Sequence, residues 1–98
     1  KPGMTGVEID AIARNVIYEA GYEGCFGHGL GHGTGLNVHE SPRASLRYDK
    51  QVTTGMTLTV EPGIYVKDFG GVRIEDLIVF NETGYENLTF SPKYLIEL

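Results

Sequence analysis

The three histidines of the chain, His28, His32 and His39, lie within a glycine-rich segment of twelve residues. Histidine is a frequent metal ligand and changes protonation near neutral pH, so such a group can bind a divalent cation or transfer protons. Taken alone, the same histidines could be loop residues that hydrogen-bond to the backbone. Further potential metal ligands elsewhere in the chain would favour the first of these two interpretations.

Two glutamates occupy positions where an ordinary sheet needs no carboxylate. Glu61 ends an alternating apolar segment directly before Pro62, and Glu75 lies with Arg73 inside the apolar stretch 72–80. A carboxylate in a half-buried strand must be paired, hydrogen-bonded or bound to a metal. The spacing alone favours an Arg73–Glu75 ion pair, and Glu61 alone would be a solvated strand end. Nevertheless, one histidine with several carboxylates forms an oxygen-rich donor set suited to Mn, Co, Fe or Zn.

Cys25 is the single cysteine of the chain and has no partner for an internal disulfide, which fits a reducing compartment. No second cysteine supports a zinc knuckle, and no local signature supports a thiol protease. The first four residues contain no apolar leader segment, so we interpret the N-terminus as a cut edge. No apolar run approaches the roughly 20 residues that a membrane span needs. We therefore expect a cytoplasmic protein that does not interact with membranes.

Composition and charge limit the remaining classes of function. The 98 residues, 41% hydrophobic and 21% charged, are typical of one small globular domain. A chain of this length buries about 60 to 65% of its surface, so its stability can depend on a partner segment. The net charge of −5 disfavours nucleic acid as a partner and favours metal cations.

The elements that must position these residues follow from the sequence pattern. Thr5 and Glu8 form a capping box, and apolar residues recur at helical spacing until Gly21, which predicts a helix over about 5–20. Alternating glycines predict an extended segment over 27–36, with His28 and His32 on one face. The remaining predictions are a turn at 41–42, a polar connection at 43–54, strands at 56–60, 64–66, 72–80 and 85–90, and turns at 68–71 and 81–84. The expected class is α+β, one helix followed by a mostly antiparallel sheet.

Three motifs of the chain resemble those of a known enzyme family. The segment 27–40, GHGLGHGTGLNVHE, is similar to the histidine motif of Xaa-Pro dipeptidases and aminopeptidases P. The segments 59–65, TVEPGIY, and 71–76, GVRIED, look like the two later glutamate motifs of the same family, in the same order. Methionine aminopeptidases share the fold and the spacing from His32 to His39. However, they usually lack the histidine equivalent to His28 and the glycine after Glu-Pro.

The resemblance implies the C-terminal half of a pita-bread fold, with 1–98 forming part of a metallopeptidase catalytic domain. It also implies two divalent metal ions, Mn or Co first and Zn or Fe as alternatives, with a bridging hydroxide that attacks the Xaa-Pro bond. The matching metal ligands are His32, Glu61 and the bridging Glu75. The resemblance further implies that His28 and His39 contact substrate and stabilise the intermediate, that Arg73 supports Glu75, and that Tyr65 lines the substrate pocket.

The chain departs from the family pattern in one large respect. Two aspartate ligands and an N-terminal domain precede this region in the family, and the aspartates of this chain, Asp10, Asp49, Asp68 and Asp76, stand in other contexts. We therefore expect the chain alone to be inactive, and expect its partners to be a Xaa-Pro peptide and the missing N-terminal half, or a second copy in a homodimer. A non-catalytic pita-bread module that binds proteins or peptides is the alternative from another class.

Overall fold

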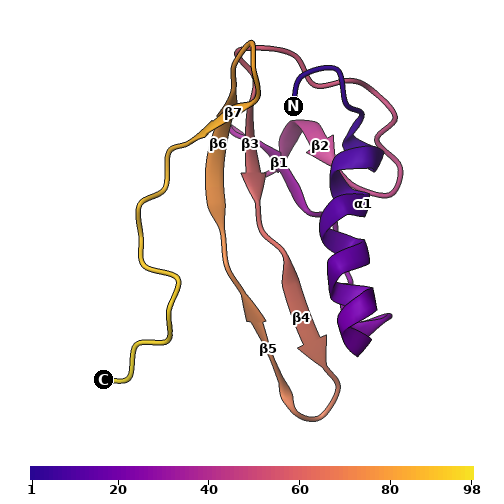
Figure 1. Ribbon diagram of the computed structural model, residues 1–98, viewed down its shortest axis with the longest axis vertical. Coiled ribbons are helices and arrows are strands. Elements are labelled where there is room, and N and C mark those ends of the chain that lie inside the picture. Colours follow the sequence, from indigo (N-terminus) through magenta and orange to yellow (C-terminus); the bar gives the residue numbers. More distant parts are fainter.

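The computed structural model describes residues 1–98 as one helix beside a set of antiparallel strand pairs (Figure 1). Helix α1 (Gly6–Ile17) continues into a π-helical turn, η1 (Tyr18–Tyr22). The strands are β1 (Gly31–Gly33), β2 (Glu40–Ala44), β3 (Thr57–Val60), β4 (Gly63–Val66), β5 (Gly70–Arg73), β6 (Asp76–Phe80) and β7 (Tyr85–Asn87). They form three small sheets, with strand orders β1-β2, β3-β6-β7 and β4-β5. The predicted α+β class is confirmed.

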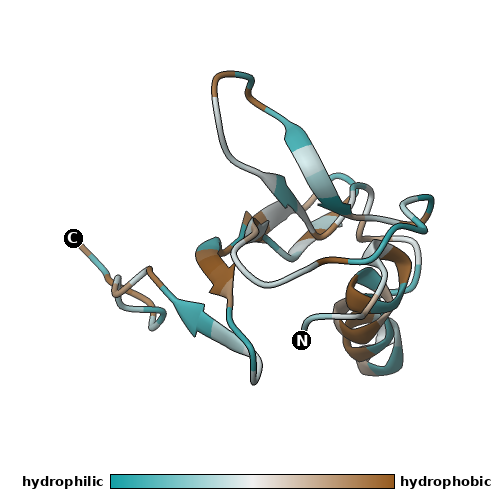
Figure 2. Ribbon diagram, turned by 90° about the horizontal axis from the view of Figure 1, so that it is seen from above, coloured by the Kyte–Doolittle hydropathy of each residue, from teal (hydrophilic) through white to brown (hydrophobic).

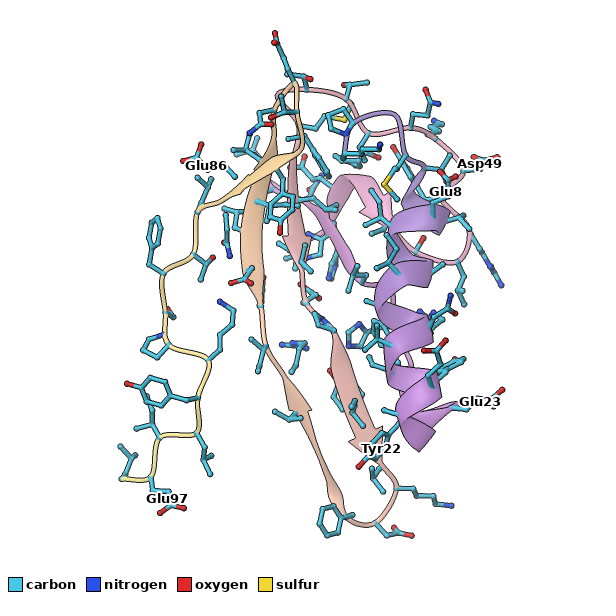
Figure 3. All side chains as sticks on the ribbon, viewed as in Figure 1. Glu8, Tyr22, Glu23, Asp49, Glu86 and Glu97 are labelled. Carbon is cyan, nitrogen blue, oxygen red and sulfur yellow. The ribbon has the colours of Figure 1, made fainter.

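Helix α1 begins at the predicted capping box. Glu8 N–H donates to Thr5 Oγ1 over 3.2 Å, and Thr5 N–H donates to Glu8 Oε2 over 2.7 Å. These bonds satisfy two backbone donors that the first turn of any helix leaves free. The α-helical part ends earlier than predicted, at Ile17, and Gly21 adopts the left-handed conformation, φ 98°, that ends helices. In Figure 3, Glu8 marks the first turn of α1, and Tyr22 and Glu23 mark the end of η1.

The capping box should give the helix a measurable pH dependence. The hydrogen bond that the Glu8 carboxylate accepts from the Thr5 backbone lowers the pKa of Glu8 from the ordinary 4.5. The stabilisation of the folded chain by this bond is therefore present above pH 4.5 and is lost as pH falls through the lowered pKa. In urea unfolding between about pH 5 and 3, we expect Glu8→Gln to lose part of this dependence while its amide oxygen still caps the helix. Thr5→Ala should cost about 0.5–2 kcal/mol at neutral pH. Identical pH profiles for the parent chain and Glu8→Gln would contradict the assignment.

The chain between Thr57 and Phe80 forms a long antiparallel ladder that is interrupted at one point. Val60 pairs with Asp76 and Gly63 pairs with Arg73, so the register is the same on both sides of the interruption. The prediction of one continuous strand over 72–80 is wrong, because residues 74–75 belong to no strand and only the Ile74 N–H, which donates to the Pro62 carbonyl over 3.4 Å, crosses between the two strands there. The physical cause is Pro62 on the opposite strand, which has no N–H to donate to a ladder.

Three other predicted elements differ from the structure in extent. The extended segment 27–36 contains only the short strand β1, and the return strand over 85–90 ends at Asn87. The predicted turn at 41–42 lies within β2, which pairs with β1 across a register shift after His32. Glycines in the first segment and Pro42 in β2 weaken regular pairing, and tertiary contacts decide where a ladder forms. The hairpin turn at 81–84 lies where it was predicted, whereas the turn predicted at 68–71 lies at 67–69, because Gly70 and Gly71 belong to β5.

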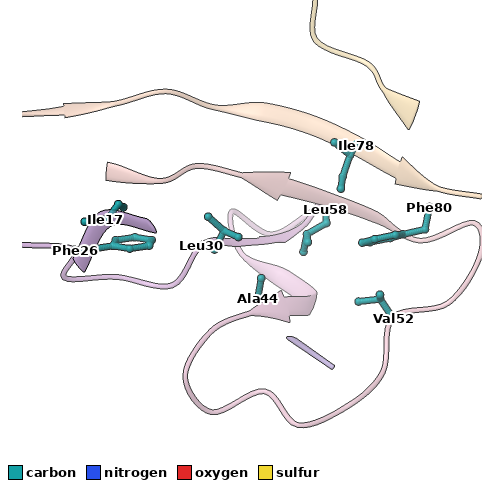
Figure 4. Close-up of a cluster of buried hydrophobic side chains, with 8 residues drawn as sticks. All are labelled: Ile17, Phe26, Leu30, Ala44, Val52, Leu58, Ile78 and Phe80. Atoms are coloured by element: carbon teal, nitrogen blue, oxygen red, sulfur yellow. The ribbon is translucent and has the colours of Figure 1, made fainter. Parts of the chain in front are cut away.

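The core lies between α1 and strands β1, β2, β3 and β6. Its buried members are Ile17, Phe26, Leu30, Ala44, Val52, Leu58, Ile78 and Phe80 (Figure 4). Helix α1 carries both hydrophobic and hydrophilic positions (Figure 2), and its residues Ile9 and Ala13 pack against this cluster. The core therefore fixes the position of β1, which carries His32, relative to β3, which leads into Glu61.

The segment after β7 runs away from the helix to the C-terminus (Figures 1 and 3). Its one ion pair joins Lys93 Nζ to Asp76 Oδ1 over 2.8 Å, and Phe90, Leu95 and Leu98 are among its exposed apolar residues. No helix of the structure combines the length and the hydropathy needed to cross a membrane.

Candidate active site

A cavity of about 320 Å³ lies where the histidine segment meets the interruption of the long ladder. No hydrophobic side chain lines it. Its lining residues are His28, Gly29, Gly31, His32, His39, Arg43, Ser45, Glu61 and Arg73. The structure thus brings five of the seven predicted site residues to one polar cavity, and the other two, Tyr65 and Glu75, lie outside its lining.

His32 is held by its own backbone and by a close contact between two strands. Its N–H donates to Thr59 Oγ1 over 3.0 Å, and Thr59 is buried. Gly31 lies so close to β3 that a Cβ at this position would collide with the carbonyl oxygen of Thr59. This explains why glycine stands beside the histidine, since the backbone approach leaves no room for a side chain.

The two ring nitrogens of His32 have different surroundings. Nδ1 lies 2.8 Å from the carbonyl oxygen of Gly33, which can only accept, so Nδ1 carries the proton. In the neutral ring, Nε2 then carries a lone pair, and it lies 3.5 Å from Glu61 Oε2. Both side chains are mostly buried, 17% and 15% exposed. An imidazole whose second nitrogen donates to a carbonyl is the usual arrangement of a metal-binding histidine. A proton or a cation between Nε2 and the carboxylate would stabilise this pair.

Glu75 lies opposite Glu61 in the register of the interrupted ladder, but its side chain is exposed. The Arg73–Glu75 ion pair that the spacing favoured does not form. The chain holds no group of three His, Cys, Asp or Glu side chains that could bind a metal. Side-chain geometry therefore joins His32 to Glu61, and backbone register alone associates Glu75 with them.

His28 is oriented by a second set of contacts. Its Nδ1 donates to the carbonyl oxygen of Gly29 over 2.7 Å, so Nε2 of the neutral ring accepts from the Tyr65 hydroxyl over 2.8 Å. The ring also stands edge-on to Phe26, with 5.0 Å between centroids. The structure therefore places Tyr65 in contact with His28, although Tyr65 comes from β4.

His39 lies on the outer side of His32, with the two ring centroids 4.6 Å apart and nearly perpendicular. It is exposed, and its ring nitrogens make no hydrogen bond within the chain. Arg43, which was not predicted, pairs with His32 in the β1–β2 register and lines the same cavity. Only strand pairing identifies Arg43, because nothing in its local sequence marks it.

Two further polar residues behind the site were missed by sequence reasoning. Asp10 and Arg14 on α1 form a buried ion pair of 2.7 Å and bind the backbone of the histidine segment. The available signal was their spacing of four residues on the apolar side of the predicted helix, together with Ile17.

The family model described as metallopeptidase family M24 matches residues 1–82. The chain belongs to this family. A relative from Pyrococcus horikoshii, named Xaa-Pro dipeptidase, is 54% identical over 97 residues, which are 98% of this chain and 27% of the relative. The family assignment agrees with the resemblance of the three motifs.

Solved structures of M24 relatives have the same fold. The structure titled Xaa-Pro dipeptidase from Bacillus anthracis is 52% identical, with a TM-score of 0.95, and the match covers 100% of this chain and 28% of that one. An X-prolyl aminopeptidase from Caenorhabditis elegans, described as cytosolic with a dinuclear active site, is 31% identical, with a TM-score of 0.77, covering 93% of this chain and 17% of that one. The pita-bread assignment is confirmed. The chain spans 27–28% of the length of the first curated relatives.

The donors that the chain brings together are of a chemical type that divalent metal ions accept. His32, with its Nδ1–H tautomer, and Glu61 supply one nitrogen and one carboxylate ligand without a thiolate, as Mn, Co, Fe or Zn accept. Cys25 is not among the residues that line the cavity.

Proposed function

We propose that this chain forms part of a metallopeptidase that hydrolyses Xaa-Pro peptide bonds at a dinuclear metal centre. The observation that carries the proposal is the 3.5 Å approach of His32 Nε2 to Glu61 Oε2, at the edge of a polar cavity and beside the register position of Glu75. The names of the Pyrococcus and Bacillus relatives support the substrate class.

His32, Glu61 and Glu75 would hold the metal ions, with Glu75 shared between them. When bound, two divalent ions lower the pKa of a shared water and polarise the scissile carbonyl. The description of the Caenorhabditis enzyme supports the number of two ions. Two charges need more anionic ligands than these three residues, so the remaining ligands would come from chain beyond the 98 residues. We propose Mn or Co as the metal, and the cytoplasm as the location.

The remaining site residues would bind and orient the peptide. His39 has free ring nitrogens, so it can donate a hydrogen bond to a carbonyl oxygen that gains negative charge. Tyr65 donates its hydroxyl proton to His28 Nε2 in one hydrogen bond. This proton can shift between the hydroxyl oxygen and Nε2 as charge develops on the substrate. Arg73 lines the same cavity as Glu61 and supplies a fixed positive charge there.

The rest of the longer enzyme would also cover apolar surface that this chain leaves open. A groove of about 290 Å³ lies between α1 and β6, with nine hydrophobic residues among the twelve that line it. Burial of this apolar surface would stabilise the binding of a further segment of the enzyme to the groove. Without that segment, a second copy of the 98-residue chain would cover the groove in a homodimer.

A chimera tests the proposed activity. In the Bacillus anthracis Xaa-Pro dipeptidase, this chain would replace the 28% of the enzyme to which it is similar. The replaced part aligns with all of this chain. We expect the chimera to release proline from a Xaa-Pro dipeptide in the presence of Mn, because the chain supplies its share of the metal ligands. His32→Ala should reduce kcat/KM by more than about 100-fold, a larger loss than that from changing an outer partner of a ligand.

The matched control is Lys67→Gln, which changes an exposed residue of the β4–β5 turn and should leave turnover unchanged. Melting temperature and bound metal would be measured on every variant. A folded, metal-loaded chimera without Xaa-Pro hydrolysis would contradict the proposal and favour the non-catalytic module. Equal activity on peptides that begin with methionine and lack proline would favour a methionine aminopeptidase.

A further inference from the structure

A buried ion pair on α1 lies directly behind the segment that carries His28. Asp10 is fully buried and Arg14 is 7% exposed. Arg14 Nε donates to Asp10 Oδ2 over 2.7 Å, and Nη2 donates to Oδ1 over 3.2 Å. The hydrogen bonds that Arg14 donates to Asp10 are the main cause that raises the pKa of Arg14, so the guanidinium stays charged despite its burial. Apolar residues of similar volume often stabilise a core as well as a buried ion pair does, so the pair has to be explained by more than stability.

The other polar contacts of this pair all go to the backbone of one extended segment. Arg14 Nη1 donates to the Phe26 carbonyl over 2.8 Å, and Nη2 donates to the His28 carbonyl over 2.9 Å. Leu30 N–H donates to Asp10 Oδ1 over 2.9 Å. Three alternate residues of the segment are thereby fixed to one face of α1.

The same segment binds the backbone of two site residues on its other side. Glu61 N–H donates to the Leu30 carbonyl over 2.7 Å, and Tyr65 N–H donates to the Cys25 carbonyl over 2.9 Å. The guanidinium of Arg14 also lies 4.4 Å from the ring centroid of Phe26, whose ring stands against His28. Residues 25–30 thus connect the ion pair on α1 to the side of the cavity that holds His28 and Glu61.

We propose that Asp10 and Arg14 are positioning residues of the peptidase site, which fix residues 26–30 and thereby orient His28 and the backbone of Glu61. This inference rests on the proposed function, because the orientation of His28 and Glu61 serves catalysis only in a peptidase. Neither residue needs to touch the substrate. A lysine at position 14 would keep the charge, but its single ammonium group could not match the planar fork that reaches Asp10, Phe26 and His28 together.

The first test measures the His28 ring without using activity. Imidazole ¹⁵N shifts would be recorded for the 98-residue chain, for Arg14→Lys, and for Val52→Ala, which opens the core at a fully buried residue outside the contacts of the ion pair. We expect the Nδ1–H tautomer of His28 in the chain and in Val52→Ala, and a mixture of tautomers in Arg14→Lys. An unchanged His28 signature in Arg14→Lys would overturn the proposal.

The second test separates positioning from stability in the chimera. At a temperature well below all melting points, we expect Arg14→Lys to lower kcat by about 10- to 100-fold, as loss of a ligand's supporting partner does. The change in KM should be small, and Val52→Ala should keep its kcat at a comparable loss of melting temperature. Guanidinium at low concentration should partly restore turnover to Arg14→Gly, and urea should not, because Arg14 lines an open cavity of about 380 Å³.

Equal losses of kcat in Arg14→Lys and Val52→Ala, without rescue by guanidinium, would show a purely structural role and overturn the proposal. An inactive parent chimera would count against the proposed function instead, and the ring measurement on the 98-residue chain would still decide the role of Arg14. If Arg14→Lys fails to fold, Asp10→Glu provides the same comparison, because it keeps the charge and displaces the carboxylate.

Discussion

Glu75→Gln in the chimera is expected to abolish Xaa-Pro hydrolysis. A neutral amide bridges two cations poorly, because it supplies one uncharged oxygen where the carboxylate supplies two that share a negative charge. The loss of kcat/KM should exceed the roughly 10- to 100-fold effect of changing an outer partner of a metal ligand. Metal content would be measured together with turnover, and the number of bound ions should fall in parallel.

His39→Ala is the informative comparison for Glu75→Gln. His39 lies beside His32 without a hydrogen bond of its own, so its loss should lower turnover and leave the bound metal unchanged. Glu82→Gln removes an exposed carboxylate from the β6–β7 turn and controls for the change in net charge. Full activity of Glu75→Gln would rule out a bridging role. It would indicate that the Glu75 side chain stays exposed in the chimera, as it is in this chain.

The 98-residue chain by itself is expected to bind at most one divalent ion, weakly, and to show no peptidase activity. His32 and Glu61 are the two donors that side-chain geometry brings together, and no group of three forms in the chain. Two cations a few ångströms apart would share too little negative charge to offset their repulsion. Calorimetry with Mn or Co and an assay with a Xaa-Pro dipeptide test both parts of this expectation.

The matched variant for the binding measurement is His32→Ala, which should remove the remaining metal binding. His28→Ala should leave it intact, because both ring nitrogens of His28 have partners within the chain. Tight binding of two ions per chain, with turnover, would mean that the chain completes its own site. That outcome would contradict a need for ligands from outside the 98 residues.

Local chemistry is sufficient to predict several elements of this chain. Thr5 and Glu8 satisfy each other's backbone groups within one turn, so the start of α1 follows from four residues. Gly21 interrupts the helical conformation because its φ of 98° is one that glycine adopts readily and that side chains disfavour. The hairpin at 81–84 likewise depends on neighbouring residues, since Asn81 Oδ1 accepts from the backbone of Thr83 and Gly84.

The extent of the strands depends on residues far away in sequence. The apolar pattern of 72–80 predicts one strand, but Pro62 on the opposite strand cannot complete the ladder there. The pattern predicts a half-buried Glu75 side chain, but in the structure this side chain is exposed. The Arg73–Glu75 ion pair is absent. A single strand carries no information about the backbone donors of its partner.

The sequence by itself determined the residue types of the site and their family. The glycine-flanked histidines and the two glutamate motifs carry enough specific residues to indicate an M24 chain without coordinates. Only the tertiary structure decided that His32 faces Glu61, that Tyr65 binds His28, and that Asp10 and Arg14 hold the segment between them. The reason is physical: donor chemistry belongs to each residue, whereas distances between residues 12 to 37 positions apart are set by strand pairing and core packing.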